Sequence, residues 1–279
     1  MFKNLNCHSL GHKVGSFEDT VKLAKEFGFA GVDPDLGYAR EKGVAAVKDL
    51  LAANGLKAGG FSLSVSWRDN HSDREYAESL EKFAGDCRIA AELGVTRCMT
   101  WVMPCSDKLT YHQHFEMFVS RMRPVAQILK GFGQSLGLEF IGPRTLRVSR
   151  KHGFIYTMDG MRAAAAAIGT GNVGFLLDAF HWYTAQATVS DIEALDPKEV
   201  VYVHVNDGRA GVPVTEQVDN KRELPGNGVI DLKGFFGALR KIGYDGPVTV
   251  EPFNDAVKAM SLPDAVKATS AALDKVLKA

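Results

Sequence analysis

Short apolar runs alternate with longer amphipathic stretches along most of the chain. Runs of this length, rich in Val, Phe and Leu, predict buried strands, whereas apolar residues spaced three and four apart predict helices. The amphipathic stretches between the runs include residues 17–29, 74–94 and 232–246. The runs that fit the strand pattern are residues 3–9, 29–35, 56–65, 95–102, 136–142, 172–180, 200–207 and 246–253.

The junctions between these segments support a repeating unit. Glycines stand near several of them, at Gly28, Gly94, Gly137 and Gly243. A helix that ends in glycine just before a strand is typical of a parallel sheet. Eight such units predict an α/β fold, a (β/α)8 or TIM barrel, and no linker divides residues 1–279, so we expect a single domain.

Composition and charge limit the partners. The chain has 279 residues, of which 46% are hydrophobic and 24% charged, and Lys plus Arg equals Asp plus Glu at 33 each. This balance gives no electrostatic reason to expect a nucleic acid or a membrane surface as partner. The sequence shows neither a membrane span nor a signal peptide, so we expect a cytoplasmic protein, and a homo-oligomer stays open. The four cysteines form no C-x-x-C pair, and we expect reduced thiols.

Polar residues end four consecutive predicted strands in the second half of the chain. They are Glu139, Asp178, His204 and Glu251. Each one alone is an ordinary strand-ending residue, but in a barrel the carboxyl ends of the strands converge at the active-site face. Three carboxylates brought together would repel each other, and a divalent cation would relieve the repulsion. Oxygen ligands with one imidazole suit Mn²⁺ best, with Mg²⁺, Co²⁺ or Zn²⁺ as alternatives. His181 follows Asp178 beyond the strand end, so we expect it to contact substrate.

The chain resembles the xylose-isomerase-like TIM barrels, a family of sugar isomerases and epimerases. The pieces that carry the resemblance are "LEF", "LLDAFHWY", "YVHVND", "LPGNGVIDL" and "IGYDGPVTVEPF". The phrasing is most similar to that of inosose (2-keto-myo-inositol) isomerases, and ketose 3-epimerases share the same ligands. The resemblance implies that the four strand-ending residues bind the metal and that Glu139 and Glu251 also act as acid and base. It further implies that His181 and Arg209 hold substrate oxygens.

Two departures narrow the resemblance. DNA-repair endonucleases on this fold need further histidines, and the loop here carries Asp219, Asn220 and Lys221 where that family has Asp-x-His. Ketose 3-epimerases commonly carry one more glutamate six residues after the first ligand, where this chain has Thr145. The first departure argues against a nuclease, and the second against a ketohexose as substrate.

Further substrate contacts are expected from the first half of the chain. His8 ends the first predicted strand, and Asp33 and Asp35 end the second. Trp67 and Trp101 end the third and fourth, where aromatic rings would suit the apolar faces of a sugar or simply plug the barrel mouth. The long, polar connection after residue 204 is expected to lie over the same face.

The predicted function is a metal-dependent isomerase or epimerase of a small polyol ketone, an inosose or a ketose, acting by proton transfer through an enediolate. A lyase that eliminates water or a glycosyl oxygen from an inosose or a keto-sugar is the alternative at the same site. A catalytically silent barrel is the third, and the intact ligand set argues against it. No phosphate loop is visible, which favours an unphosphorylated substrate.

Overall fold

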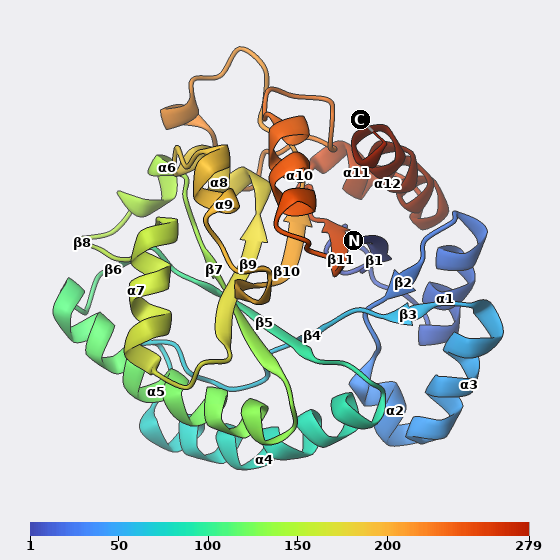
Figure 1. The fold of residues 1–279 in the computed structure, drawn as a ribbon, viewed down its shortest axis with the longest axis horizontal. Coiled ribbons are helices and arrows are strands. Elements are labelled where there is room, and N and C mark those ends of the chain that lie inside the picture. The colour runs from blue at the N-terminus through green and yellow to red at the C-terminus, as the bar shows by residue number, and fades with distance from the viewer. Residues whose placement is uncertain (279) are drawn as a thin grey trace.

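Parallel strands curl into a barrel in the computed structural model, which describes residues 1–278 (Figure 1). The strand order is β3-β2-β1-β11-β10-β9-β7-β5-β4, and every pair in it is parallel. The bounds are β1 (Phe2–Leu5), β2 (Gly31–Val32), β3 (Lys57–Ala58), β4 (Phe61–Ser62), β5 (Arg97–Val102), β7 (Ser135–Phe140), β9 (Val173–Asp178), β10 (Val200–Val205) and β11 (Pro247–Val250).

The third barrel strand is split into two short pieces. Each piece pairs with a different neighbour, and together they close the barrel. β3 pairs with β2, β4 pairs with β5, and only Gly59 and Gly60 separate the two pieces. A Cβ atom on Gly60 would lie 2.5 Å from the Met99 methyl group and 2.9 Å from the Tyr202 ring, so the interior leaves room for glycine alone. Counting β3 and β4 as one strand gives the predicted (β/α)8 barrel, and the fold prediction is confirmed.

Helices surround the barrel (Figure 1), and they bury apolar residues. In α10 the buried side includes Leu232, Phe235, Phe236 and Leu239, and Asp231 caps the helix. The helices are α1 (Phe17–Glu26), α2 (Leu36–Lys42), α3 (Val44–Asn54), α4 (Asp73–Glu92), α5 (Tyr111–Gly131), α6 (Arg144–Arg147), α7 (Met158–Ile168), α8 (Ala179–Thr184), α9 (Val189–Glu193), α10 (Leu232–Lys241), α11 (Asp255–Ala259) and α12 (Leu262–Leu277), with 3₁₀ turns at Pro197–Glu199 and Val214–Glu216. A small antiparallel pair, β6 (Cys105–Ser106) with β8 (His152–Gly153), lies outside the barrel.

Three of the four glycines expected at the junction between a helix and the next strand are found there. Gly28, Gly94 and Gly243 have positive φ values of 70°, 77° and 83°, as residues after a helix C-terminus commonly do. The fourth is wrong, because Gly137 lies inside β7 and the left-handed residue after α5 is Gly133. At Gly137 a Cβ atom would lie 3.1 Å from the backbone nitrogen of Leu176, so this glycine serves close strand packing instead.

Side chains inside the barrel form layers, and these layers fix the depth of the site. Met99, Leu176 and Tyr202 form one buried cluster. Thr249 joins the same layer, because its hydroxyl lies 2.6 Å from that of Tyr202. Since side chains alternate between the two faces of a strand, the residue two positions further along each strand faces the interior one layer higher. That next layer contains Trp101, Asp178, His204 and Glu251, and Glu139 stands in register with Trp101.

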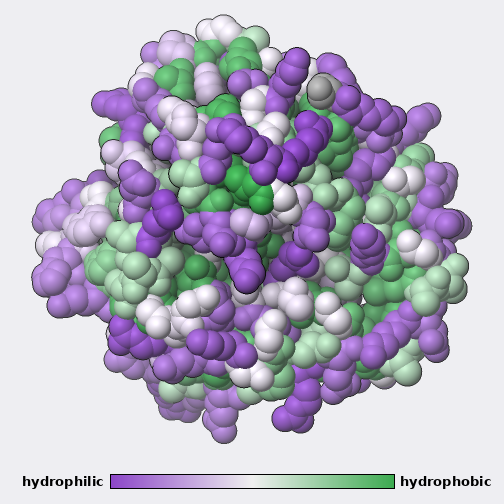
Figure 2. Space-filling model, viewed as in Figure 1, coloured by the Kyte–Doolittle hydropathy of each residue, from purple (hydrophilic) through white to green (hydrophobic). Residues whose placement is uncertain are grey.

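The surface is of mixed polarity. On the face seen in Figure 2, hydrophilic residues are spread widely, with hydrophobic residues between them. Among residues 1–278, no helix is both long and apolar enough to cross a membrane. All four cysteines are unpaired and buried, as expected for structural thiols.

Candidate metal and substrate site

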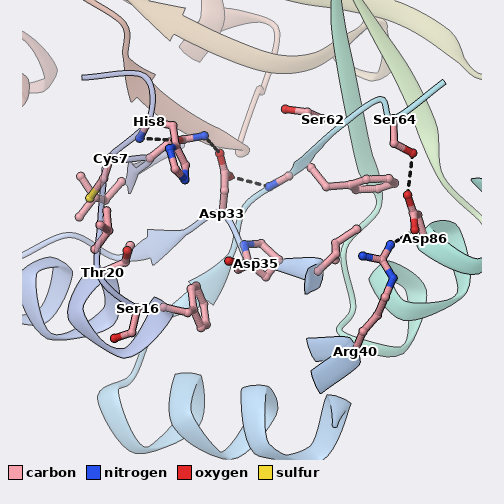
Figure 3. Close-up of a pocket in the computed structure, with 18 of the residues that line it drawn as sticks. Cys7, His8, Ser16, Thr20, Asp33, Asp35, Arg40, Ser62, Ser64 and Asp86 are labelled. Carbon is pink, nitrogen blue, oxygen red and sulfur yellow. Dashed lines mark hydrogen bonds and ion pairs between the residues drawn. The ribbon is translucent and has the colours of Figure 1, made fainter. Parts of the chain in front are cut away.

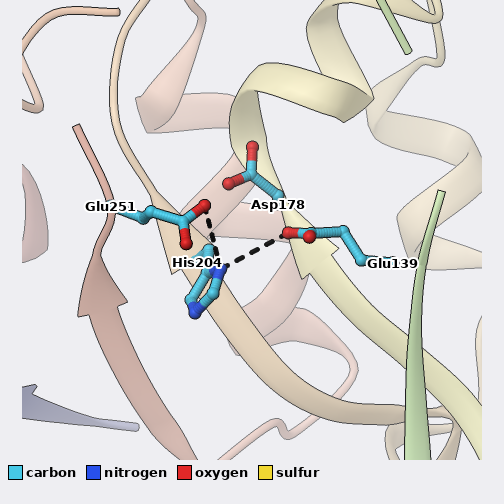
Figure 4. Close-up of side chains that lie close together, drawn as sticks. All are labelled: Glu139, Asp178, His204 and Glu251. Atoms are coloured by element: carbon cyan, nitrogen blue, oxygen red, sulfur yellow. Dashed lines mark ion pairs between the residues drawn. The ribbon is translucent and has the colours of Figure 1, made fainter. Parts of the chain in front are cut away.

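The four predicted ligands come together at the carboxyl end of the barrel (Figure 4). Glu139 lies on β7, Asp178 ends β9, His204 lies on β10, and Glu251 directly follows β11. Each offers one ligand atom, and these atoms all lie within 4.8 Å of one another. Four adjacent strands thus supply one group each, because their carboxyl ends stand at similar depth in a parallel barrel.

Two of the possible ligand atoms of this cluster lack ordinary hydrogen-bond partners. The Nδ1 atom of His204 lies 3.3 Å from Glu139 Oε1 and 3.6 Å from Glu251 Oε2. Both His204 Nδ1 and Glu139 Oε1 are nevertheless buried without an aligned hydrogen bond. Buried polar atoms are rarely left unsatisfied, and these point at a shared centre. Three carboxylates and one imidazole are a fitting donor set for a divalent cation.

The electrostatics show that the cluster is short of positive charge. Burial raises the pKa of the Glu139 carboxyl to about 8, and the nearby Glu251 carboxylate adds to the rise. Burial by itself would lower the pKa of His204, but Glu251 and Glu139 raise it to about 9. Uptake of protons by this cluster would relieve its excess negative charge when no other cation is present. A metal ion would supply the charge and displace these protons.

Asp178 is held by the start of the helix that follows it. Its Oδ1 accepts from the backbone N–H groups of Phe180 at 2.7 Å and His181 at 3.1 Å, as an N-cap does. Its Oδ2 accepts from Asn206 at 2.9 Å and from Arg222 at 3.1 Å. Burial opposes ionisation, but Arg222 and the neighbouring imidazoles outweigh it and lower the pKa of Asp178.

Arg222 lies fully buried beside the cluster, and sequence reasoning missed it. Its guanidinium donates to Asp178 Oδ2 at 3.1 Å, Glu251 Oε2 at 3.2 Å and Asp219 Oδ1 at 2.9 Å. These carboxylates hold its pKa well above the usual range despite burial. Arg209, the predicted arginine, instead lies half-exposed in the same loop, with its Nε 3.6 Å from Glu223. Its predicted role in holding substrate oxygens stays a prediction.

The loop that carries Arg222 is built around Asp207. This carboxylate is 1% exposed and accepts from four backbone N–H groups, those of Gly208, Gly226, Gly228 and Ile230, at 2.8–3.0 Å. Thr145, where ketose 3-epimerases commonly have a glutamate, donates to the backbone oxygen of Gln217 at 2.9 Å and so fastens the same loop. The long connection therefore lies over the site, as expected from its sequence.

His181 lies next to the cluster but not in it. Its ring is fully buried, with Nδ1 3.3 Å from the Gly142 N–H and Nε2 3.1 Å from Arg222 Nη2. Burial lowers the pKa of His181 to about 4, so the ring is neutral. Among residues 1–278 it makes no hydrogen bond to the clustered residues except the one from its backbone N–H to Asp178. Its predicted contact with substrate stays a prediction.

The other predicted substrate residues divide into exposed and buried ones. His8 is exposed and, with Asp33 and Asp35, lines a cleft of about 440 Å³ beside the first two strands (Figure 3). Trp101 is 44% exposed in the layer of the four clustered residues, and its predicted contact with substrate stays a prediction. Trp67 is only 1% exposed, because it packs on Phe118 in the core, so the ring expected at the mouth is covered.

Phe253 is a second residue that the sequence reasoning missed. It lies two positions after Glu251, is 44% exposed, and has an unusual positive φ of 38°. Its ring centre is 4.7 Å from the Arg222 guanidinium. A strained backbone beside a buried charge cluster is typical of functional sites. Its signal in the sequence was the "EPF" that ends the eighth strand.

The chain matches one protein family over most of its length. The family described as "Xylose isomerase-like TIM barrel" matches residues 21–276. A solved structure, that of a xylose isomerase domain protein from Alicyclobacillus acidocaldarius, is 30% identical with a TM-score of 0.88, and the match covers 99% of this chain and 98% of the other.

Curated relatives carry isomerase, epimerase and dehydratase names. An inosose isomerase of Halalkalibacterium halodurans is 25% identical over 82% of this chain and 78% of its own length. A ketose 3-epimerase of Arthrobacter globiformis is 27% identical over 92% of this chain and 86% of its own. A 3-dehydroshikimate dehydratase of Pseudomonas aeruginosa is 33% identical, but over only 32% of this chain and 14% of its own length.

Proposed function

We propose that this chain, which belongs to the xylose isomerase-like TIM barrel family, is a divalent-metal-dependent isomerase or epimerase of a small polyol ketone. The observation that carries the proposal is the convergence of Glu139, Asp178, His204 and Glu251, with ligand atoms within 4.8 Å of one another. The relatives named inosose isomerase and ketose 3-epimerase support the reaction class and suggest an inosose or a ketose as substrate.

The four clustered residues would hold the metal, with Mn²⁺ as the preferred ion. When bound, the ion would polarise the substrate carbonyl and stabilise the negative charge of the enediolate. The orphaned His204 Nδ1 and Glu139 Oε1 are the donor atoms left free for it. Arg222 would share the charge compensation with the ion, because it donates to Asp178 and Glu251 but makes no hydrogen bond to Glu139.

Glu139 and Glu251 are proposed to move the proton. They flank His204 Nδ1 at 3.3 and 3.6 Å, so they stand on two sides of the cluster centre. One carboxylate would take the proton from the carbon next to the carbonyl, and the other would return it on the opposite face. Trp101 and Phe253, both 44% exposed, are placed to cover the apolar faces of the substrate and keep water from the enediolate.

Turnover in D₂O tests this proposal. The Mn²⁺-loaded protein should place deuterium on the carbon next to the carbonyl when it is given 2-keto-myo-inositol or a ketose. Glu139→Gln and Glu251→Gln should each lower that exchange by at least ~10²-fold, since each removes a general base. Glu199→Gln, a surface glutamate paired with Arg162, is the matched control and should exchange normally. Product that carries no deuterium after several turnovers would refute the proton-transfer mechanism.

A lyase at the same site is the second candidate, supported by the partial match to a 3-dehydroshikimate dehydratase. The same enediolate eliminates instead of reprotonating when a leaving oxygen stands on the next carbon. New ultraviolet absorbance from an enone would identify elimination, whereas a change in optical rotation without it would identify isomerisation.

A further inference from the structure

Arg68 presents a positive charge at the barrel mouth that the proposed function does not use. It lies in the connection between β4 and α4, with its guanidinium carbon 4.9 Å from the Trp67 ring centre and 4.1 Å from that of Trp101. Its hydrogen bonds leave from Nη2 alone, to Thr100 Oγ1 at 3.3 Å and to the Trp101 backbone oxygen at 3.2 Å. Nη1 makes no hydrogen bond to any residue in the range 1–278.

No acid balances this charge within residues 1–278. The Nε atom of Arg68 is buried and has no hydrogen-bond partner. The neighbouring carboxylate, Asp69, accepts instead from the Ser106 hydroxyl at 2.8 Å. Burial lowers the pKa of Arg68, and no carboxylate offsets this effect. A partly buried guanidinium without an anion is unfavourable, so the arrangement indicates a partner that arrives from outside.

The position of Arg68 relates it directly to the metal ligands. Trp101, on which it stacks, stands opposite Glu139 in the pairing of β5 with β7. Paired residues on adjacent parallel strands lie about 4.8 Å apart and point to the same face. Arg68 therefore stacks on the side chain that stands beside Glu139 in the barrel.

The loop that carries Arg68 is fixed in place. Nη1 of Arg121 donates to the backbone oxygens of Trp67 and Arg68 at 3.0 Å each and to that of His71 at 3.3 Å. Nη2 of Arg121 pairs with Asp73 at 2.7 Å, so Arg121 itself is committed. Arg68 is thus a preorganised cation, which lowers the cost of binding an anion.

We propose that the substrate of this site carries a carboxylate at the end away from its ketone, and that Arg68 binds it. The inference rests on the proposed function, whose substrate it narrows from polyol ketones to acidic ones. A planar guanidinium fork matches a carboxylate, and one unpaired cation balances one negative charge. A phosphate would bring nearly two, and Arg121 of α5, which binds the backbone of this loop, is already paired with Asp73.

Three sugars with the same ketone end test the inference. D-fructose ends in a hydroxymethyl group, D-fructuronate in a carboxylate, and D-fructose 6-phosphate in a phosphate. Titration calorimetry on the Mn²⁺-loaded protein should give about 10- to 100-fold tighter binding of D-fructuronate than of D-fructose, the usual gain from a charge-assisted hydrogen bond. Arg68→Gln should reduce this preference to about threefold or less. Arg74→Gln, an exposed arginine of α4 that pairs with Glu78, should leave it intact.

A salt series on the unaltered protein gives the same answer if Arg68→Gln does not fold. Binding of D-fructuronate should weaken as salt rises, whereas binding of D-fructose should not. The inference is overturned if wild-type protein binds both sugars equally, if the preference survives Arg68→Gln, or if the phosphate is preferred. If the protein exchanges deuterium into D-fructose but shows no preference for D-fructuronate, this inference alone is wrong. If it neither binds nor exchanges any of the three sugars, the proposed function is wrong as well.

Discussion

Replacing Asp207 with alanine should loosen the loop that places Arg222 against the four clustered residues. The Asp207 carboxylate is the hub of that loop, because it accepts from the N–H groups of Gly208, Gly226, Gly228 and Ile230. Its own backbone also exchanges two hydrogen bonds of 2.8 Å with Glu223, the residue after Arg222. Alanine keeps the backbone pair but removes every side-chain acceptor, so the turn at residues 226–230 loses its anchor.

The expected loss can be worked from the burial of each hydrogen bond. The bonds from Gly208 and Ile230 are buried, whereas those from Gly226 and Gly228 are partly open to water. A buried donor without an acceptor costs ~1–3 kcal/mol, and an open one is rehydrated at little cost. Asp207→Ala should therefore lower the free energy of unfolding by about 2–6 kcal/mol. Asp207→Asn keeps one acceptor oxygen but turns an NH₂ group toward other donors, so it should fall between alanine and wild type.

Urea unfolding measures the loss of overall stability, and amide hydrogen exchange measures the local loosening of the turn. Exchange should speed up at Gly226, Gly228 and Ile230 before it does in the barrel strands, and metal-dependent activity should fall with it. Asp231→Ala is the matched control, because Asp231 caps α10 through one bond of 2.8 Å to the Gly234 N–H. It should cost only ~1 kcal/mol and leave exchange at residues 226–230 unchanged. If Asp207→Ala were as mild as this control, the anchoring role would be wrong.

Three further outcomes are expected. Mn²⁺ binding should release protons, because the pKa of His204 is raised to about 9 and its imidazole must lose a proton to bind the metal; a pH indicator in weak buffer can follow this release. The apparent affinity for Mn²⁺ should therefore rise with pH up to about that value and fall in acid. Purified His204→Ala should contain little metal and His181→Ala should retain most of it, because the His181 ring faces Arg222; an empty His181→Ala with a full His204→Ala would reverse the assignment. At 100 times its dissociation constant the metal should stabilise the fold by about 2.7 kcal/mol, and EDTA-treated protein that melts at the same temperature with and without Mn²⁺ would contradict a bound ion.

The fold and the four clustered residues could be predicted because both follow from local patterns. Buried parallel strands produce apolar runs, and the barrel places the ends of such runs at one face. Asp178 and His204 stand at the ends of the clearest runs, so their convergence needed only the strand order. The split third strand could not be foreseen in the same way, because the room at Gly60 depends on Met99 and Tyr202 from distant parts of the sequence.

The residues that were missed or misplaced depend on tertiary contacts. Arg209 lies closer to His204 in sequence than Arg222 does, yet the anchored turn near Asp207 brings Arg222 back to the ligands. Trp67 ends an apolar run as Trp101 does, but only Trp101 is exposed at the layer of Glu139. Hydrophobic periodicity shows which side of a strand a residue takes. It does not show whether another element covers that side.

The distribution of charge indicates where a substrate would lie. Arg222 binds Asp178 and Glu251 directly but makes no hydrogen bond to Glu139, whose Oε1 is left without a partner. The Glu139 side of the cluster therefore lacks the guanidinium contacts that Arg222 gives to the other two carboxylates. On the neighbouring strand the Trp101 ring stacks on Arg68, whose positive charge no carboxylate balances. The two groups are too far apart in the structure to form an ion pair, so each needs a partner of its own. A metal ion beside Glu139 and an anionic group beside Arg68 would satisfy both, and a ketone that bears an acid at its far end is a molecule that would bridge the two positions.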